Sequence, residues 1–139
     1  MANDSSQDIR DRTFRLGSAV AKLALTLSTR PGVRWLVDQL LKAGTAVGAD
    51  LEEAKAGSSK RDFIRYVEIS LREARETSYW LRICAALELA PLGELSALRS
   101  ESDQVARILG AIVVSSKRRL MAGYSAFAFC ILTLALLMS

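Results

Sequence analysis

The sequence contains no histidine. This excludes catalytic triads that use His, His general bases and His metal ligands. The two cysteines, Cys84 and Cys130, lie in separate segments without C-x-x-C spacing, which argues against a disulfide or a zinc site. We interpret Cys84 as a small core residue, and the two free thiols as typical of a reducing cytoplasm.

Charge is missing from the end of the chain, because every Lys, Arg, Asp and Glu lies before Leu120. As a helix, residues 120–139 would be about 30 Å long, which matches the hydrocarbon thickness of a bilayer. We therefore predict a transmembrane tail anchor here, flanked on the cytoplasmic side by Lys117, Arg118 and Arg119. Two alternatives stay open: a fifth helix buried in an oligomer, or a non-native extension.

Residues 1–15 lack the apolar run of a secretory signal peptide. Together with the predicted anchor, this places the folded part in the cytoplasm, tethered to the inner membrane. The net charge of +4 permits contact with nucleic acid or anionic lipid without requiring either.

No strand pattern is visible, and half of the residues are apolar, which is enough for one core. Apolar residues recur at helical spacing in four segments, approximately residues 9–27, 31–56, 59–89 and 94–119. Short turns between them favour an all-α, antiparallel up-down-up-down four-helix bundle over residues 9–119. Residues 1–8 are predicted to be a flexible tail.

The third segment is the one around which the others are organised. Ser59 and Asp62 form a predicted helix cap, and nothing after them breaks a helix up to Leu89. Besides its core stripe, this helix has a second apolar seam. A second stripe also runs along the first helix. We interpret both as a contact between subunits, with ordinary packing within one bundle as the alternative. The predicted interface residues are Phe14, Leu25, Ile69, Glu73, Trp80 and Ile83.

The third helix also has a basic edge that is a candidate nucleic-acid surface. It consists of Lys60, Arg61, Arg65, Arg72 and Arg75. An oligomer would repeat this edge and multiply weak phosphate contacts. The alternative is an ordinary solvated helix face, since acidic residues interrupt it.

Four acidic residues, Glu52, Glu53, Glu73 and Glu76, could form paired carboxylates. Bundle di-metal sites use Glu-x-x-His motifs, and His is absent, so we predict no metal, no cofactor and no enzymatic activity. Glu73 lies within an apolar seam, where an unpaired charge is costly. We expect it to meet a hydrogen-bond donor across a helix or subunit boundary.

Several blocks of the chain resemble a known bacterial family. They are residues 39–57, 59–63 and 72–81, and the last block holds the pairs Glu73-Ala74 and Glu76-Thr77 and the triplet Tyr79-Trp80-Leu81. In these blocks the chain resembles the four-helix-bundle family encoded by intervening sequences in bacterial 23S rRNA genes. Asp50 departs from the family pattern, in which Asn is usual, and residues after Arg119 lie outside it.

The resemblance implies a closed ring oligomer, with a pentamer as the recurring state. A related bundle, the accessory protein of diversity-generating retroelements, binds nucleic acid and a reverse transcriptase. We therefore predict a non-enzymatic oligomeric binding or scaffold protein. Its expected partners are itself, RNA or DNA, and a protein encoded nearby. The alternative is a membrane-anchored oligomer whose clustered C-terminal helices act in or on the bilayer.

Overall fold

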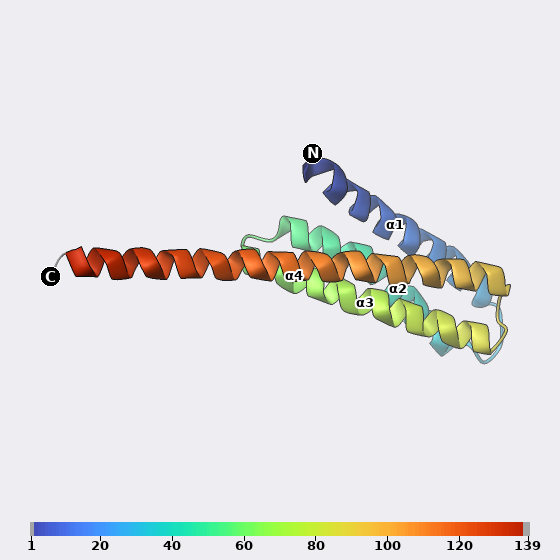
Figure 1. Cartoon of the computed structure of the whole chain (residues 1–139). Coiled ribbons are helices and arrows are strands. Elements are labelled where there is room, and N and C mark those ends of the chain that lie inside the picture. The colour runs from blue at the N-terminus through green and yellow to red at the C-terminus, as the bar shows by residue number, and fades with distance from the viewer. Residues whose placement is uncertain (1, 138–139) are drawn as a thin grey trace.

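Four helices make up the computed structural model, which describes residues 2–137, with side chains described for residues 9–131. They are α1 (Ala2–Leu27), α2 (Arg34–Ala56), α3 (Lys60–Ala86) and α4 (Leu92–Leu137). Consecutive helices contact one another and α1 also contacts α4, which closes the bundle (Figure 1). No strand occurs in the described part of the chain. The predicted all-α, up-down-up-down four-helix bundle is confirmed.

The predicted cap of α3 is present. The backbone N–H of Asp62 donates to Ser59 Oγ over 3.1 Å, and the Ser59 hydroxyl donates to the Asp62 carboxylate over 2.7 Å. At the other end, α3 stops at Ala86, earlier than predicted, because Glu88 adopts a positive φ of 52°. The backbone N–H of Leu89 then donates back to the carbonyl of Cys84, which is a common helix-terminating turn.

Two other helix starts differ from the sequence prediction. α2 begins at Arg34 rather than Pro31, because Gly32 in the preceding turn has a φ of 80° that no helix accommodates. Thr29 does not cap α2, since its hydroxyl donates to the carbonyl of Thr26 at the end of α1. α1 has helical backbone from Ala2, where we predicted a flexible tail.

The predicted apolar stripes form the core. The side chains of Val20, Leu40, Val67, Leu81 and Leu109 are fully buried, and Cys84 lies among them. Burial raises the pKa of the Cys84 thiol, as expected for a core residue. Buried hydroxyls are satisfied by neighbouring helices: Ser70 donates to the carbonyl of Val47 over 2.6 Å and Ser102 to that of Ala74 over 2.7 Å.

α1 and α2 approach each other closely because glycines lie between them. A Cβ atom added at Gly44 would lie 2.5 Å from Val20 Cγ1, and one added at Gly17 would lie 3.2 Å from the Gly44 carbonyl oxygen. Gly48 faces Thr13 in the same way, at 3.5 Å. Gly44 and Gly48 lie four residues apart, a spacing that in the sequence alone is typical of close packing against a neighbouring helix.

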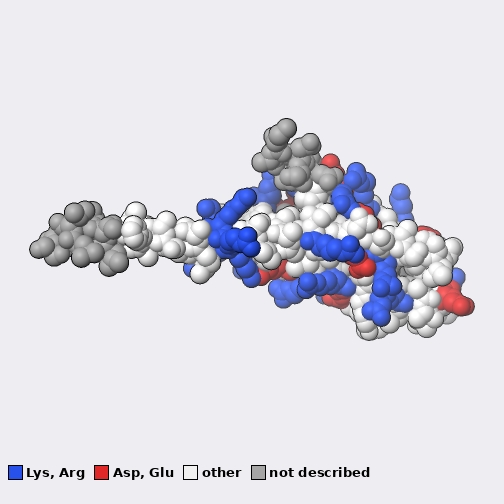
Figure 2. Space-filling model, in the orientation of Figure 1, with Lys and Arg blue, Asp and Glu red and all other residues white. Residues whose placement is uncertain are grey.

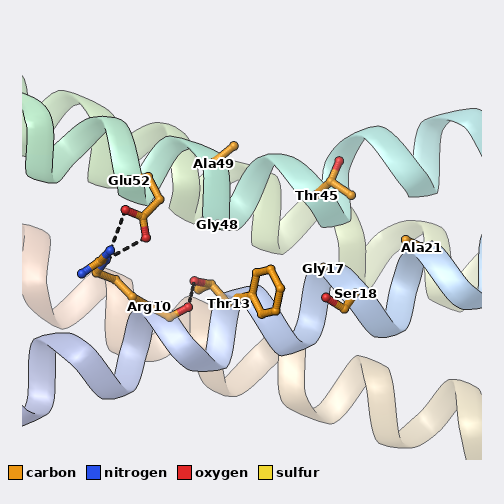
Figure 3. A pocket seen from close by; sticks show the side chains of 10 residues that line it. Arg10, Thr13, Gly17, Ser18, Ala21, Thr45, Gly48, Ala49 and Glu52 are labelled. Atoms are coloured by element: carbon orange, nitrogen blue, oxygen red, sulfur yellow. Dashed lines mark hydrogen bonds and ion pairs between the residues drawn. The ribbon is translucent and has the colours of Figure 1, made fainter.

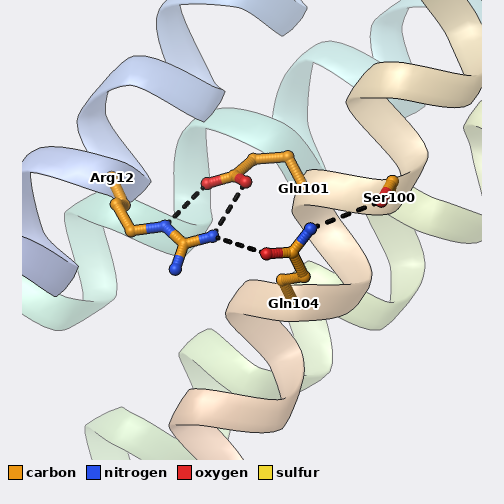
Figure 4. Close-up of polar contacts among 4 residues, drawn as sticks. All are labelled: Arg12, Ser100, Glu101 and Gln104. Atoms are coloured by element: carbon orange, nitrogen blue, oxygen red, sulfur yellow. Dashed lines mark hydrogen bonds and ion pairs between the residues drawn. The ribbon is translucent and has the colours of Figure 1, made fainter.

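A two-pronged ion pair joins α1 to α4 (Figure 4). Arg12 donates through Nε and Nη2 to the two carboxylate oxygens of Glu101, each over 2.8 Å, and its Nη2 also lies 3.2 Å from Gln104 Oε1. Both ionic side chains are partly buried. The Arg12 hydrogen bond lowers the pKa of the Glu101 carboxyl.

α4 continues far beyond the other helices (Figure 1). We predicted a bundle helix ending at Arg119 and a separate tail, but one unbroken helix runs from Leu92 to Leu137 because no Gly-Pro signal or cap interrupts it. Large apolar side chains along its projecting part are exposed, namely Met121, Tyr124, Phe127, Phe129 and Ile131.

The predicted transmembrane anchor is not supported by the described residues. None of their helices has an apolar stretch of sufficient length to cross a bilayer. Residues 132–139 of the predicted anchor lie outside the residues whose side chains are described.

Candidate nucleic-acid interface

The basic edge predicted on α3 is exposed over its whole length. Lys60, Arg61, Arg65, Arg72 and Arg75 all present their side chains to solvent. The helical period places them on the side of α3 away from its buried stripe, and the N-terminal cap at Ser59 fixes where this edge begins.

α4 extends this edge into a wider surface that the sequence interpretation did not assemble. Arg107, Lys117, Arg118 and Arg119 are exposed on α4, which packs beside α3. Figure 2 shows Lys and Arg gathered over these two helices and around the point where α4 leaves the bundle. We call the cations of both helices the α3–α4 basic face. The sequence held a signal for it, because Arg107 and Arg118 lie on one side of a regular helix.

Few acidic groups neutralise the α3–α4 basic face. Lys117 pairs with Glu68 over 2.5 Å, so this acid, which interrupts the basic edge of α3, is already paired. Two arginines lie over aromatic rings: Arg61 is 5.6 Å from the centre of the Tyr124 ring, and Arg65 is 5.1 Å from that of Tyr66. These contacts keep the charge available, since a ring face does not neutralise a guanidinium.

Among the described residues, no ion pair involves the remaining arginines of this face. They are Arg72, Arg75, Arg107, Arg118 and Arg119. A row of exposed, unneutralised guanidinium groups along two packed helices can contact consecutive phosphates of a nucleic acid backbone.

The predicted interface residues lie on two surfaces, one on α1 and one on α3. Phe14 and Leu25 lie on α1 and are 74% and 70% exposed. Ile69, Glu73, Trp80 and Ile83 lie on α3 and are half-buried. Trp80 is held between neighbours: its ring centre is 5.4 Å from that of Trp35 and its indole N–H donates to Glu76 over 3.0 Å.

We expected Glu73 to meet a hydrogen-bond donor across a helix or subunit boundary, and within this chain it does not. No described side chain donates a hydrogen bond to its carboxylate. Its pKa is raised, mainly by burial and then by the nearby carboxylates of Glu76 and Asp50, with Lys42 and Arg72 acting in the opposite direction. The pKa of Asp50 is raised as well, by burial and by Glu53. The subunit boundary therefore remains the place where we predict the donor.

A shallow groove of about 380 Å³ lies between α1 and α2. Small side chains line most of it, including Gly17, Ala21 and Gly48, because the close helix approach leaves no room for larger ones (Figure 3). Arg10 and Glu52 form its charged end and share two hydrogen bonds of 2.7 Å. We had considered Glu52 as one of two paired carboxylates, but its carboxylate is hydrogen-bonded to Arg10.

No group of His, Cys, Asp and Glu among the described residues could hold a metal ion. Comparison with curated proteins gives no match. Among solved structures, the chain is similar to a protein of unknown function from the S23 ribosomal protein family of Bacteroides thetaiotaomicron. The two are 27% identical with a TM-score of 0.72, over 76% of this chain and 97% of that one.

The profile of the 23S rRNA-intervening sequence proteins matches residues 5–111, which include α2, α3 and all residues of the predicted basic edge and subunit interface. The match and the shared bundle confirm the resemblance that the block around Tyr79-Trp80-Leu81 indicated. The chain belongs to the 23S rRNA-intervening sequence protein family.

Proposed function

We propose that this protein is a non-enzymatic, self-associating bundle that binds RNA or DNA through the α3–α4 basic face. The observation that supports the proposal is the row of exposed arginines on two packed helices without acidic partners. Binding of this kind neutralises phosphates and releases counterions, so it depends steeply on salt and weakly on sequence.

Self-association is the second part of the proposal. It is supported by the exposed Phe14 and Leu25 and by the half-buried seam around Trp80. The family resemblance implies a closed ring, with a pentamer as the expected size. Repeating the basic face around an oligomer raises the effective concentration of cations near one nucleic acid strand. A protein encoded nearby would be a further partner of such a scaffold.

Titration of a labelled RNA or DNA duplex by fluorescence anisotropy at several salt concentrations tests the nucleic-acid part. For a variant with Lys60, Arg61 and Arg65 all changed to Glu, we expect loss of binding at moderate salt with an unchanged helical circular dichroism signal. Each lost phosphate contact should make the slope of log K against log salt less negative by about 0.9.

The matched control reverses an equal number of cations away from this face, in the variant Arg30→Glu, Arg34→Glu, Lys55→Glu. These side chains are exposed on α2 and the turn before it. It should retain most of the affinity, because the net charge changes equally while the α3–α4 basic face is intact. Equal weakening by both variants, or no binding by the wild type at low salt, would refute nucleic-acid recognition by this face.

The alternative function, in which clustered C-terminal helices act within a bilayer, is not favoured, because the described residues contain no span. A location on the cytoplasmic side of the inner membrane stays a proposal. It is supported by the exposed cations Lys117, Arg118 and Arg119 directly before the exposed apolar part of α4.

A further inference from the structure

The two predicted contact surfaces have matching patterns. On α1, the apolar Phe14 and Leu25 are eleven positions apart, with Lys22 between them. On α3, Ile69 and Trp80 are also eleven positions apart, with Glu76 between them. Eleven residues make about three helical turns, or about 16 Å, so the two apolar groups of each helix lie on one side. Glu76 follows Ile69 by seven residues and shares that side, whereas Lys22 follows Phe14 by eight residues and lies at its edge.

The two patterns also lie at the same height in the bundle. Gly48 of α2 packs against Thr13, and its neighbour Val47 accepts the hydrogen bond of Ser70. Phe14 and Ile69, each adjacent to one of these contacts, are therefore level with each other. α1 and α3 run in the same direction (Figure 1), so Leu25 and Trp80 share a level as well.

The charges of the two surfaces are opposite in net sign, although Lys42 and Arg72 also lie near Glu73 and Asp11 is exposed one turn before Phe14. Beside Phe14 and Leu25, α1 exposes the cations Arg15 and Lys22. The α3 surface holds the carboxylates of Glu73 and Glu76, and α2 adds Asp50 next to Glu73. Contact of either surface with its own copy would bring like charges together, whereas contact between the two surfaces pairs them.

We propose that the α1 surface of one copy (Phe14, Lys22, Leu25) docks on the α3 surface of a second copy (Ile69, Glu76, Trp80), with the two helices parallel and in this register. The inference rests on the self-association part of the proposed function and specifies its geometry. In this register Lys22 is level with residue 77, next to Glu76, and pairs with the Glu76 carboxylate.

Such a contact is head-to-tail, because each copy uses two different surfaces. Both surfaces border α2: the groove beside Phe14 is lined by Thr45 and Ala49, and Trp80 packs against Trp35. The α1 surface and the α3 surface therefore lie on the two sides of α2 and are inclined toward each other there. Repetition of the contact closes a ring with α2 inside and α4 outside, which leaves the α3–α4 basic face of every copy accessible.

A mixing experiment with the full chain tests the pairing. One variant carries Phe14→Asp and Leu25→Asp, which damage only the α1 surface. The other carries Ile69→Asp and Glu76→Lys, which damage only the α3 surface. Circular dichroism and thermal melting show whether each is folded, and native mass spectrometry gives the size of each assembly. We expect each variant alone to be a monomer.

An equimolar mixture should form one-to-one dimers and nothing larger, because only one intact pair of surfaces remains between the two variants. Assembly of either variant alone to the wild-type size, or a mixture that stays monomeric, would overturn the pairing while wild-type assembly still supports self-association. A monomeric wild type would overturn both.

If the α3 variant does not fold, a charge exchange between two exposed side chains tests the same contact. Lys22→Glu and Glu76→Lys should each weaken assembly at least tenfold, and the double variant should restore it at low salt. Restoration supports the proposed register, and a double variant as weak as the single ones contradicts it.

Discussion

Gly44 lies where α1 and α2 come closest. A Cβ atom there would be 2.9 Å from Val20 Cβ and 2.5 Å from Val20 Cγ1, and Val20 is fully buried with a stiff, β-branched side chain. We expect Gly44→Ala to lower the free energy of unfolding by about 1–3 kcal/mol, the usual cost of overpacking a core. Chemical denaturation of the purified variant measures it.

Gly110 provides the matched control for this prediction. It lies within α4, and an added Cβ atom would meet nothing within 4 Å. Gly110→Ala should therefore raise the free energy of unfolding by up to about 1 kcal/mol, because alanine restricts the unfolded chain and favours helix. Equal effects of the two substitutions would show that the glycines of α2 do not set the helix separation.

At the scale of single residues, the sequence predicted local features such as caps and close packing, but not the contacts between distant residues. Spacing by four was enough to indicate that Gly44 and Gly48 face another helix, and the Ser59 cap followed from residue types alone. The partner of Glu101 could not be predicted, because Arg12 is distant in sequence and only the packing of α1 on α4 brings them together. The same holds for Arg10 and Glu52.

The contact between α1 and α4 depends partly on charge. Because the Arg12 hydrogen bond lowers the folded-state pKa of Glu101, the pair contributes stability above the ordinary carboxyl pKa and loses it as pH falls through the lowered value. A double-mutant cycle with Glu101→Gln and Arg12→Met should give a coupling of about 0.5–1 kcal/mol near neutral pH.

The same cycle measured in acid provides the control. Once the pH is below the folded-state pKa of Glu101, the wild-type carboxyl is protonated and the coupling should approach zero. Thermal melts at matched ionic strength give both values. A coupling that is equal at neutral and acidic pH would mean that packing, and not the ion pair, joins α1 to α4.

Element types were easier to predict than element ends. The period of apolar residues predicted all four helices, because burial of one stripe dominates the choice. The predicted start of α2 at Pro31 was wrong, because the positive φ of Gly32 outweighs the preference of Pro31 for a first helical turn. The change of composition at Leu120 indicated a boundary, yet composition alone does not end a helix, and α4 continues through it.

At the scale of the whole molecule, the chain combines a family bundle with a projecting helix. The family match ends at residue 111, and the similar Bacteroides thetaiotaomicron structure is covered almost completely by 76% of this chain. The exposed apolar side chains from Met121 to Ile131 lie beyond this bundle. The predicted pairing of basic and apolar residues at the junction could be read from sequence, but its orientation relative to the bundle could not.

Deletion of residues 120–139 should therefore leave the bundle folded. Among the described residues, the deletion removes the contact between Arg61 and the Tyr124 ring, which corresponds to about 0.5–1 kcal/mol. We expect nearly the same melting temperature for the truncated chain. Flotation with vesicles that contain anionic lipid should recover the full chain and not the truncated one, because the exposed apolar part of α4 is gone.

A second variant separates the apolar and the charged contributions to vesicle binding. Changing Lys117, Arg118 and Arg119 to Gln keeps the apolar segment and removes the cations that precede it. Binding to anionic vesicles should fall toward the level on neutral vesicles, since each cation near an anionic surface contributes about 1 kcal/mol. If the full chain ignores vesicles of both kinds, and truncation changes only its state of assembly, the projecting helix serves contacts between proteins and the membrane proposal fails.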